Sequence, residues 1–374
     1  MILRPVRKFL LLSLLLPLAL QAETGAPPEA EAGFLQLADD TGVALGDSAM
    51  RDAPRWQPPR IVLVRGTKDT VADLAAAAPG LELIAVDSQA LAVEAAGEAD
   101  AIIGYCNPQV VAAAAKASWI QIFSAGAERC LDVTPVGSGE IVLTNMQKMS
   151  APVIGEHAIA MLLALGRDLP RYARLMPEGR WERSASADGG MFPVAGRTLL
   201  VVGLGGIGSE VAKRGKALGM RVIATRNSSR SGPSYVDYVG LSDELHVLAR
   251  EAHVIVNALP LTPATEATFD ADFFAAARKG ALFISVGRGK TTVTDDLVAA
   301  LREGQIGGAG LDVTDPEPLP AEHPLWQFDN VIITPHVSWR GGTQERHMLL
   351  VRENLRRFAK GERLYNVVDP QKGY

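Results

Sequence analysis

Three polar residues in the second half of the chain have the types and positions of a site that binds an anion and transfers a proton. Arg288 follows the apolar run 281–286, and His336 follows the run 331–334. Glu317 lies between them along the chain and is flanked by two prolines. Taken singly, each is a common surface or turn residue. Because the carboxyl ends of parallel strands meet at one edge of a sheet, we expect the three to converge there.

Such a set suits hydride transfer at an alcohol carbon that lies next to a carboxylate. The planar fork of an arginine holds a carboxylate through paired hydrogen bonds. A histidine takes the hydroxyl proton on oxidation and returns it on reduction. A carboxylate bonded to the other ring nitrogen of that histidine fixes its tautomer. The hydride chemistry itself would come from a nicotinamide cofactor.

The stretch 199–208, LLVVGLGGIG, predicts where that cofactor binds. Four apolar residues typical of a buried strand lead into Gly203, Gly205 and Gly208, and residues 209–218 are expected to form a helix. The first glycine permits a tight turn, the second lets the backbone approach a pyrophosphate, and the third lets the helix pack on the strand. A glycine pattern alone is weak evidence. The strand before it and the helix after it favour dinucleotide binding at the helix N-terminus.

The end of the next predicted strand, 221–225, distinguishes NAD from NADP. An acidic residue there would bind the ribose hydroxyls. The chain instead has Arg226 and Asn227, followed by two serines and Arg230, with no acid among them. An arginine with nearby hydroxyl and amide donors suits a 2′-phosphate, which a carboxylate would repel. We therefore expect NADP to be preferred, with NAD as the alternative; an exposed basic turn without a ligand is the other interpretation.

The elements that must position these residues alternate between strands and helices in two series. This alternation predicts an α/β fold with two doubly wound parallel sheets. The apolar segment 151–167 is expected to be a helix that connects the series or forms a subunit contact, and 170–194 is expected to be irregular. The amphipathic segment 343–360 is expected to be a helix that returns to the first domain. The predicted strands are 61–65, 81–86, 101–105, 119–123 and 141–144 in the first series, and 199–202, 221–225, 254–258, 281–286, 308–313 and 331–334 in the second.

These elements suggest a domain organisation in which the first domain is discontinuous in sequence. The predicted parts are a signal peptide at 1–22, a linker or arm at 23–59, a substrate domain formed by 60–165 and 337–374, and a dinucleotide-binding Rossmann domain at 166–336.

Length and composition exclude several classes of protein. A chain of 374 residues is long enough for two domains with full cores. Its hydrophobic content of 48% and charged content of 21% are ordinary for a globular protein. The net charge of −5 and the lack of a long basic run argue against a nucleic-acid partner. The spacing of cysteines and histidines predicts no metal site.

The N-terminus has the pattern of a secretory signal. Basic residues precede the apolar run 9–20, and Ala22 offers a small residue for cleavage. The run is shorter than the ~20 residues that span a bilayer, so we expect no membrane contact beyond a possible N-terminal anchor. A Sec-type route to the periplasm or outside is expected; the alternative is a cytoplasmic protein with a start codon assigned too early. Cys106 and Cys130 are expected to be free buried thiols, although they could pair after export.

Six motifs between residues 203 and 336, taken in order, resemble those of the D-isomer-specific 2-hydroxyacid dehydrogenase family, and the resemblance covers about residues 60–374. The resemblance implies a Rossmann cofactor domain inserted in a flavodoxin-like substrate domain. It also implies NAD or NADP as cofactor, a small 2-keto or 2-hydroxy acid as substrate, and a homodimer. The matching segments are GLGGIG at 203–208, LPLTPAT at 259–265, SVGRG at 285–289, GAGLDV at 308–313, PEP at 316–318 and TPH at 334–336.

The resemblance further implies roles for single residues. Arg288 would anchor the substrate, His336 would be the acid and base, and Glu317 would be the partner of His336. Asp312 would lie near the nicotinamide carboxamide, and the backbone N–H groups of 124–126 would hold the substrate carboxylate. The cofactor-binding residues it implies are Gly203, Gly205, Ile207, Gly208, Arg226, Asn227, Val286 and Asp312, and the substrate-binding residues are Ala125, Gly126 and Trp339.

A few positions depart from the family's usual pattern or carry no role in it. Trp339 resembles the tryptophan of a subset that includes the C-terminal-binding corepressors; it could line the substrate pocket and favour a bulkier or apolar substrate, or pack at a hinge. His253 replaces an aspartate common before the fourth strand, and His157 is expected to be structural. The sequence thus predicts a 2-keto acid reductase of the glyoxylate/hydroxypyruvate type. The alternative is an NAD(P)-sensing binding protein, like the corepressors, without significant turnover.

Overall fold

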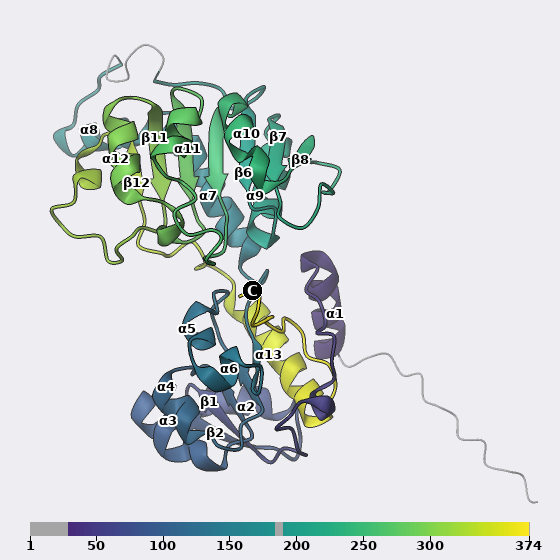
Figure 1. Cartoon of the computed structure of the whole chain (residues 1–374). Helices are drawn as coiled ribbons and strands as arrows, with labels where there is room; N and C mark the ends of the chain where they lie inside the picture. Colours follow the sequence, from purple (N-terminus) through teal and green to yellow (C-terminus); the bar gives the residue numbers. More distant parts are fainter. Residues whose placement is uncertain (1–28, 184–189, 374) are drawn as a thin grey trace, which may run out of the picture.

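The computed structural model describes residues 29–183 and 190–373, which form two α/β lobes, each built around one parallel sheet (Figure 1). The first sheet has the strand order β2-β1-β3-β4-β5, and the second has the order β12-β11-β10-β9-β6-β7-β8. The first is a flavodoxin-like order, and the second is the Rossmann order with one added strand. The predicted class, a Rossmann domain beside a flavodoxin-like domain, is confirmed.

The strands agree with the predicted ones to within a few residues at most ends. They are β1 (Ile61–Arg65), β2 (Glu82–Val86), β3 (Ala101–Ile103), β4 (Trp119–Gln121), β5 (Val142–Thr144), β6 (Thr198–Val202), β7 (Arg221–Thr225), β8 (Tyr238–Gly240), β9 (Val254–Asn257), β10 (Ala281–Ser285), β11 (Ile306–Leu311) and β12 (Val331–Ile333). Strands such as β6 and β10 are buried along their whole length, because helices cover both faces of a parallel sheet. The short strand β8 was not predicted.

The helices fill the connections between the strands. They are α1 (Glu29–Thr41), α2 (Lys68–Ala75), α3 (Gln89–Ala95), α4 (Pro108–Ala113), α5 (Glu128–Leu131), α6 (Thr134–Gly137), α7 (Ala151–Gly166), α8 (Leu169–Leu175), α9 (Gly206–Ala217), α10 (Leu245–Glu251), α11 (Ala271–Ala276), α12 (Thr294–Arg302) and α13 (Gln344–Ala359). The helix α8 lies in a segment predicted to be irregular, so that part of the expectation is wrong.

Two long helices connect the lobes. In α7, Ile154 and Leu162 are buried in one core with Leu199 of β6, so this helix covers the seven-stranded sheet. The predicted boundary after residue 165 places it instead with the first domain. In α13, Phe358 is fully buried and its ring centroid lies 5.0 Å from that of Trp119 in β4. The predicted return of this helix to the first lobe is confirmed.

The segment before β1, predicted to be a linker or a docked arm at 23–59, contains the helix α1, which packs against the first lobe. The helix α1 docks beside α13 (Figure 1), and its Phe34 is only 1% exposed and stacks edge-on against Tyr365. The helix docks because it has an apolar stripe that includes Leu37. The polar composition of the whole segment hid this stripe in the sequence. The predicted signal peptide at 1–22 lies outside the described residues. Among those that are described, no helix is long and apolar enough to cross a membrane.

The two cysteines are bonded to each other. Cys106, in the turn after β3, and Cys130, in α5, form a disulfide with their Cα atoms 5.5 Å apart. The expectation of two free thiols is therefore wrong, because the turn after β3 and the helix after β4 meet at the same edge of the sheet.

Candidate active site

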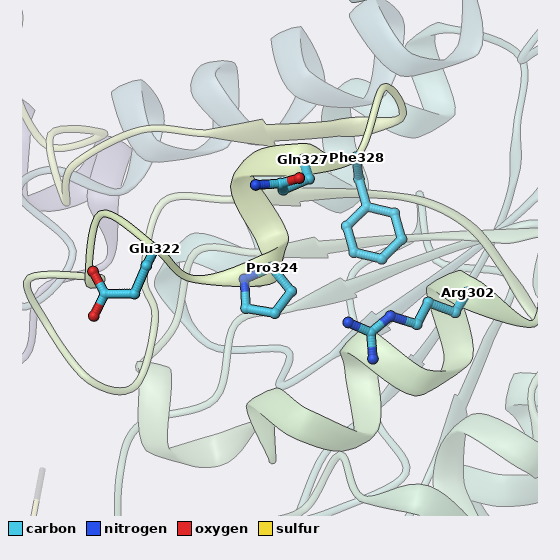
Figure 2. A pocket seen from close by; sticks show the side chains of 5 residues that line it. All are labelled: Arg302, Glu322, Pro324, Gln327 and Phe328. Carbon is cyan, nitrogen blue, oxygen red and sulfur yellow. The ribbon is translucent and has the colours of Figure 1, made fainter.

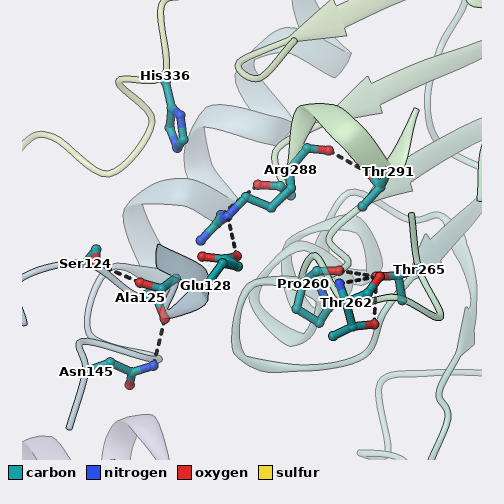
Figure 3. A network of polar contacts seen from close by, with 12 residues as sticks. Ser124, Ala125, Glu128, Asn145, Pro260, Thr262, Thr265, Arg288, Thr291 and His336 are labelled. Carbon is teal, nitrogen blue, oxygen red and sulfur yellow. Dashed lines mark hydrogen bonds and ion pairs between the residues drawn. The ribbon is translucent and has the colours of Figure 1, made fainter. Parts of the chain in front are cut away.

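Arg288 reaches from the second lobe to the first. It follows β10, and its Nε donates a hydrogen bond to Glu128 Oε1 at 3.1 Å, while its Nη1 donates to the carbonyl of Gly287 at 2.8 Å. A Cβ on Gly126 would collide with Nη2, so the guanidinium lies directly against the loop 124–126 (Figure 3). Arg288 of the second lobe and the loop 124–126 of the first lobe, both predicted to bind the substrate, are therefore in contact.

The loop 124–126 presents backbone donors to this place. Its carbonyls are occupied, since Ser124 Oγ donates to Gly126 O at 2.8 Å and the buried Asn145 donates through Nδ2 to Ala125 O at 2.7 Å. Within 29–183 and 190–373, the N–H groups of Ala125 and Gly126 have no acceptor. Two free N–H groups beside a guanidinium suit a carboxylate ligand.

His336 is held on the same side by the turn after β12. Its backbone is in the left-handed region, with φ 51°, and its N–H donates to Asp312 O at 2.8 Å. Its Nδ1 lies 3.1 Å from Glu317 Oε2, as predicted for the pair. With Glu317 accepting the Nδ1 proton, Nε2 is left for substrate; this tautomer is assigned from the contact. Figure 3 shows the ring directed toward the guanidinium of Arg288.

Asp312 holds the turn that carries His336. Its carboxylate is 2% exposed, and Oδ1 accepts hydrogen bonds from Thr334 Oγ1 at 2.6 Å and Val337 N at 2.9 Å, while Oδ2 accepts from Ser338 N at 3.1 Å. Burial acts to raise the pKa of Asp312, but these hydrogen bonds outweigh burial and the pKa is lowered. Asp312 is therefore a positioning residue; its contact with the nicotinamide carboxamide stays a prediction.

His157 extends the same network from α7. Its Nε2 lies 2.9 Å from Thr334 Oγ1, which itself donates to Asp312, so Nε2 carries the proton and donates to the hydroxyl. The chain of contacts ties α7 to the turn after β12. It supports the structural role expected for this histidine.

We expect the Asp312→Asn substitution to lower the free energy of unfolding by about 1–3 kcal/mol at neutral pH, since it leaves a buried N–H donor poorly satisfied. Because the folded pKa of Asp312 is below its ordinary value of 3.8, the contribution of the carboxylate is fully present above that pH. It is lost as the pH falls through the folded value. The difference in the free energy of unfolding between the parent and the Asp312→Asn variant can be measured by urea denaturation at a series of pH values. This difference should be constant down to about pH 5 and should shrink below that pH. An equal difference at every pH would contradict the assignment.

Sequence reasoning missed the residues that position the predicted ones. The fully buried Asn257 donates through Nδ2 to Ser285 Oγ at 3.0 Å and to Thr291 Oγ1 at 2.8 Å, and Thr291 Oγ1 donates to Arg288 O at 2.6 Å. Asn257 ends β9 and Asn145 follows β5, so the rule that found Arg288 and His336 could have found both. No comparable signal marks Glu128, whose partner is 160 residues away.

The glycine loop fits a dinucleotide. Gly203 has φ +94°, and a Cβ on Gly208 would overlap the carbonyl of Gly203, so both positions require glycine. A Cβ on Gly205 would meet nothing within 4 Å, which leaves the backbone open to a ligand. Ile207 is partly buried and packs against the core of the second lobe, and Val286 is buried in the same core. The N–H groups at the start of α9 are then available to a pyrophosphate.

Arg226 and Asn227 follow β7 beside the glycine loop, and their contact with a 2′-phosphate or ribose stays a prediction. Arg226 follows β7 directly and donates through Nη1 to Ser231 O at 3.2 Å. Asn227 is exposed. The next basic residue, Arg230, is paired with Glu244 and is not free for a ligand. Within the described part of the chain, Arg226 is therefore the unpaired basic residue that is closest in sequence to the end of β7.

Trp339 lies at the end of the same turn as His336. It is 43% exposed, its Nε1 donates to His336 O at 3.1 Å, and the guanidinium of Arg340 lies 5.4 Å from its ring centroid. The indole is thus hydrogen-bonded to the turn that carries His336. Whether it contacts substrate stays a prediction.

A surface hollow of about 390 Å³ lies away from these residues (Figure 2). It is lined by Arg302, Glu322, Pro324, Gln327 and Phe328. Arg302 ends α12 just before β11, and Phe328 precedes β12, so the hollow belongs to the amino edge of the sheet. The glycine loop, Arg288 and His336 all follow strands at the opposite edge, where ligands of such sheets bind.

The chain is similar to known proteins over both lobes. A sequence model of the D-isomer specific 2-hydroxyacid dehydrogenase NAD binding domain matches residues 159–338. A glyoxylate reductase of Korarchaeum cryptofilum is 30% identical over 293 residues, which cover 76% of this chain and 87% of that protein. A glyoxylate reductase of Pyrococcus horikoshii is 34% identical over 240 residues, 62% of this chain and 70% of that one.

One further relative in sequence and one solved structure complete the comparison. An uncharacterized protein of Corynebacterium melassecola is 42% identical over 182 residues, and the chain spans only 59% of its length. The crystal structure of an NADPH-dependent glyoxylate/hydroxypyruvate reductase from Sinorhizobium meliloti, in complex with NADP and sulfate, is similar with a TM-score of 0.73 and 26% identity, covering 84% of this chain and all of that one. Fold, site geometry and relatives agree, and the chain belongs to the D-isomer specific 2-hydroxyacid dehydrogenase family.

Proposed function

We propose that this chain reduces small 2-keto acids to D-2-hydroxy acids with a reduced nicotinamide cofactor. The observation that carries the proposal is the meeting of Arg288 with the open N–H groups of 124–126, beside the His336–Glu317 pair. Relatives named as glyoxylate reductases, and the glyoxylate/hydroxypyruvate reductase with a similar fold, support substrates of that size.

Each residue of the site has a separate role in the proposed reaction. Nη2 of Arg288 and the N–H groups of Ala125 and Gly126 bind the substrate carboxylate, which orients the neighbouring carbonyl. Glu128 keeps Arg288 in place through Nε. In the reduction His336 starts doubly protonated, donates the proton of Nε2 to the developing alkoxide and is left with the proton on Nδ1, which Glu317 accepts. When bound, the nicotinamide supplies the hydride.

NADP is the cofactor that we propose is preferred over NAD. Arg226 follows β7 where an acidic residue would otherwise bind the ribose, and residues 226–231 contain no acid. Solved relatives include family members in complex with NADPH or NADP. A positive charge at this point favours the 2′-phosphate.

A panel of 2-keto acids, assayed with NADPH and with NADH, tests the proposal. We expect turnover of glyoxylate and hydroxypyruvate and a higher kcat/KM with NADPH than with NADH. A preference for NADH would contradict the assignment of Arg226. Cofactor binding without turnover of any keto acid would instead support the alternative of an NAD(P)-sensing binding protein.

Export and dimer formation are further parts of the proposal. The disulfide between Cys106 and Cys130 supports export, since such bonds persist in oxidising compartments. The apolar helix α7 was expected to connect domains or form a subunit contact, and its burial against β10 and β11 favours the connecting role. If α7 connects the lobes, a homodimer would have to form through a different surface of the chain.

A further inference from the structure

Lys148 is a cation of the first lobe that lies against the glycine loop of the second. It lies between β5 and α7, and a Cβ built on Gly206 would be 2.9 Å from Lys148 Cγ and 3.4 Å from its Cα. Gly206 is the first residue of α9, where the free N–H groups of the helix face the expected pyrophosphate. Because Gly206 has no side chain, the stem of the lysine can occupy this space.

The charge of Lys148 is not balanced by any described carboxylate. Within 29–183 and 190–373 its ammonium forms no ion pair; it donates a hydrogen bond to the carbonyl of Gly42. Burial lowers the pKa of Lys148, and the positive charge of Arg226 lowers it further. Arg226 forms no ion pair with a described carboxylate either. Two cations that repel each other, Lys148 against the start of α9 and Arg226 just after β7, provide a setting that an anion would stabilise.

The backbone at this position is also unfavourable for a lysine. Lys148 has φ +70°, in the left-handed region that favours glycine. Such outliers persist where the surrounding structure holds them and are concentrated at functional sites. Here the surrounding structure includes α1, whose docking on the first lobe brings Gly42 to the ammonium. The N-terminal helix therefore helps to hold Lys148 at the glycine loop.

We propose that Lys148 binds a phosphate group of the dinucleotide, so that the first lobe supplies a ligand to a cofactor site otherwise built by the second. The inference rests on the proposed use of a nicotinamide cofactor. Cofactor binding then involves both lobes, and it joins the start of α9 to the strand β5 and, through Gly42, to α1.

The test is calorimetric titration of NADP+ and NAD+ into the full chain and into three variants. Lys148→Met removes the charge and keeps the backbone strain, Lys148→Gly removes both, and Lys148→Arg keeps the charge. We expect the Met and Gly variants to bind roughly ten- to a hundredfold more weakly, as for the loss of a hydrogen bond to a charged group, and the Arg variant to recover most of the affinity. Lys213→Met, at an exposed lysine of α9, is the control and should bind as the parent does.

Melting temperatures separate this effect from misfolding. The Gly variant should melt close to the parent, because relief of the positive φ offsets the loss of the hydrogen bond to Gly42. Weaker binding of both dinucleotides would identify the pyrophosphate as the group bound, and weaker binding of NADP+ alone would identify the 2′-phosphate; either result supports the proposal. Unchanged affinity of the Met and Gly variants for both would overturn it while leaving the proposed function intact. A parent chain that binds neither dinucleotide would overturn the proposed function and this inference with it.

Discussion

Replacing His336 by glutamine should lower kcat for keto-acid reduction by a factor of about 10²–10⁴, the range typical for loss of a general acid. Glutamine is similar in size and polar, so the turn held by Asp312 should persist. The reason for the loss is chemical: Nε2 of the protonated His336 ring is the group placed to donate a proton, and Glu317, 3.1 Å from Nδ1, orients the ring and stabilises its positive charge. Affinity for the cofactor should not change, because the glycine loop is untouched.

Steady-state kinetics with a saturating keto acid measure this effect. His246→Gln, at an exposed histidine of α10, is the matched control and should keep the parent's kcat. The kcat of Glu317→Gln should lie between the values for the His336 and His246 variants, since this substitution weakens the orientation of the ring without removing the acid. Parent-like kcat in the His336 variant would mean that another group donates the proton.

Replacing Arg288 by methionine should lower kcat/KM by roughly 10²–10⁴, because the positive charge and the hydrogen bonds that Nη2 donates to the substrate carboxylate are lost. Arg288→Lys should recover part of the loss, since an ammonium keeps the charge but not the planar fork that meets Gly126 and Glu128. The larger part of the effect should appear in KM, because the carboxylate is bound in the ground state as well as in the transition state.

The control for this prediction is Arg302→Met. Arg302 lines the surface hollow at the amino edge of the second sheet, so its replacement should leave kcat/KM unchanged. If the Arg302 variant lost activity and the Arg288 variant kept it, the substrate site would have been assigned to the wrong edge of the sheet.

The fold and the chemical core of the site were predictable from sequence because both follow from local patterns. Apolar runs of strand length predicted the buried strands, and the residues just after those runs, Arg288 and His336, lie at the carboxyl edge, as the topology of parallel sheets requires. Glu317 was found by its position between prolines and by the family resemblance, and its contact with His336 is confirmed.

What sequence reasoning missed depends on contacts between distant segments. Glu128 meets Arg288, and Lys148 meets Gly206, across the two lobes, and neither contact leaves a periodic signal in the chain. The disulfide was missed for the same reason, since a spacing of 24 residues says nothing of proximity. Helix α1 was missed because its few buried apolar residues lie within a polar, alanine-rich segment.

The central claim is that this chain transfers a hydride from the nicotinamide to C2 of a 2-keto acid. The most direct measurement is to incubate it with hydroxypyruvate and NADPH in which both hydrogens at C4 of the nicotinamide are replaced by deuterium, and to analyse the product by mass spectrometry and chiral chromatography. The account predicts D-glycerate with one deuterium at C2. Oxidation of the cofactor without deuterium in the product, or no product at all with this and the other keto acids of the panel, would contradict it.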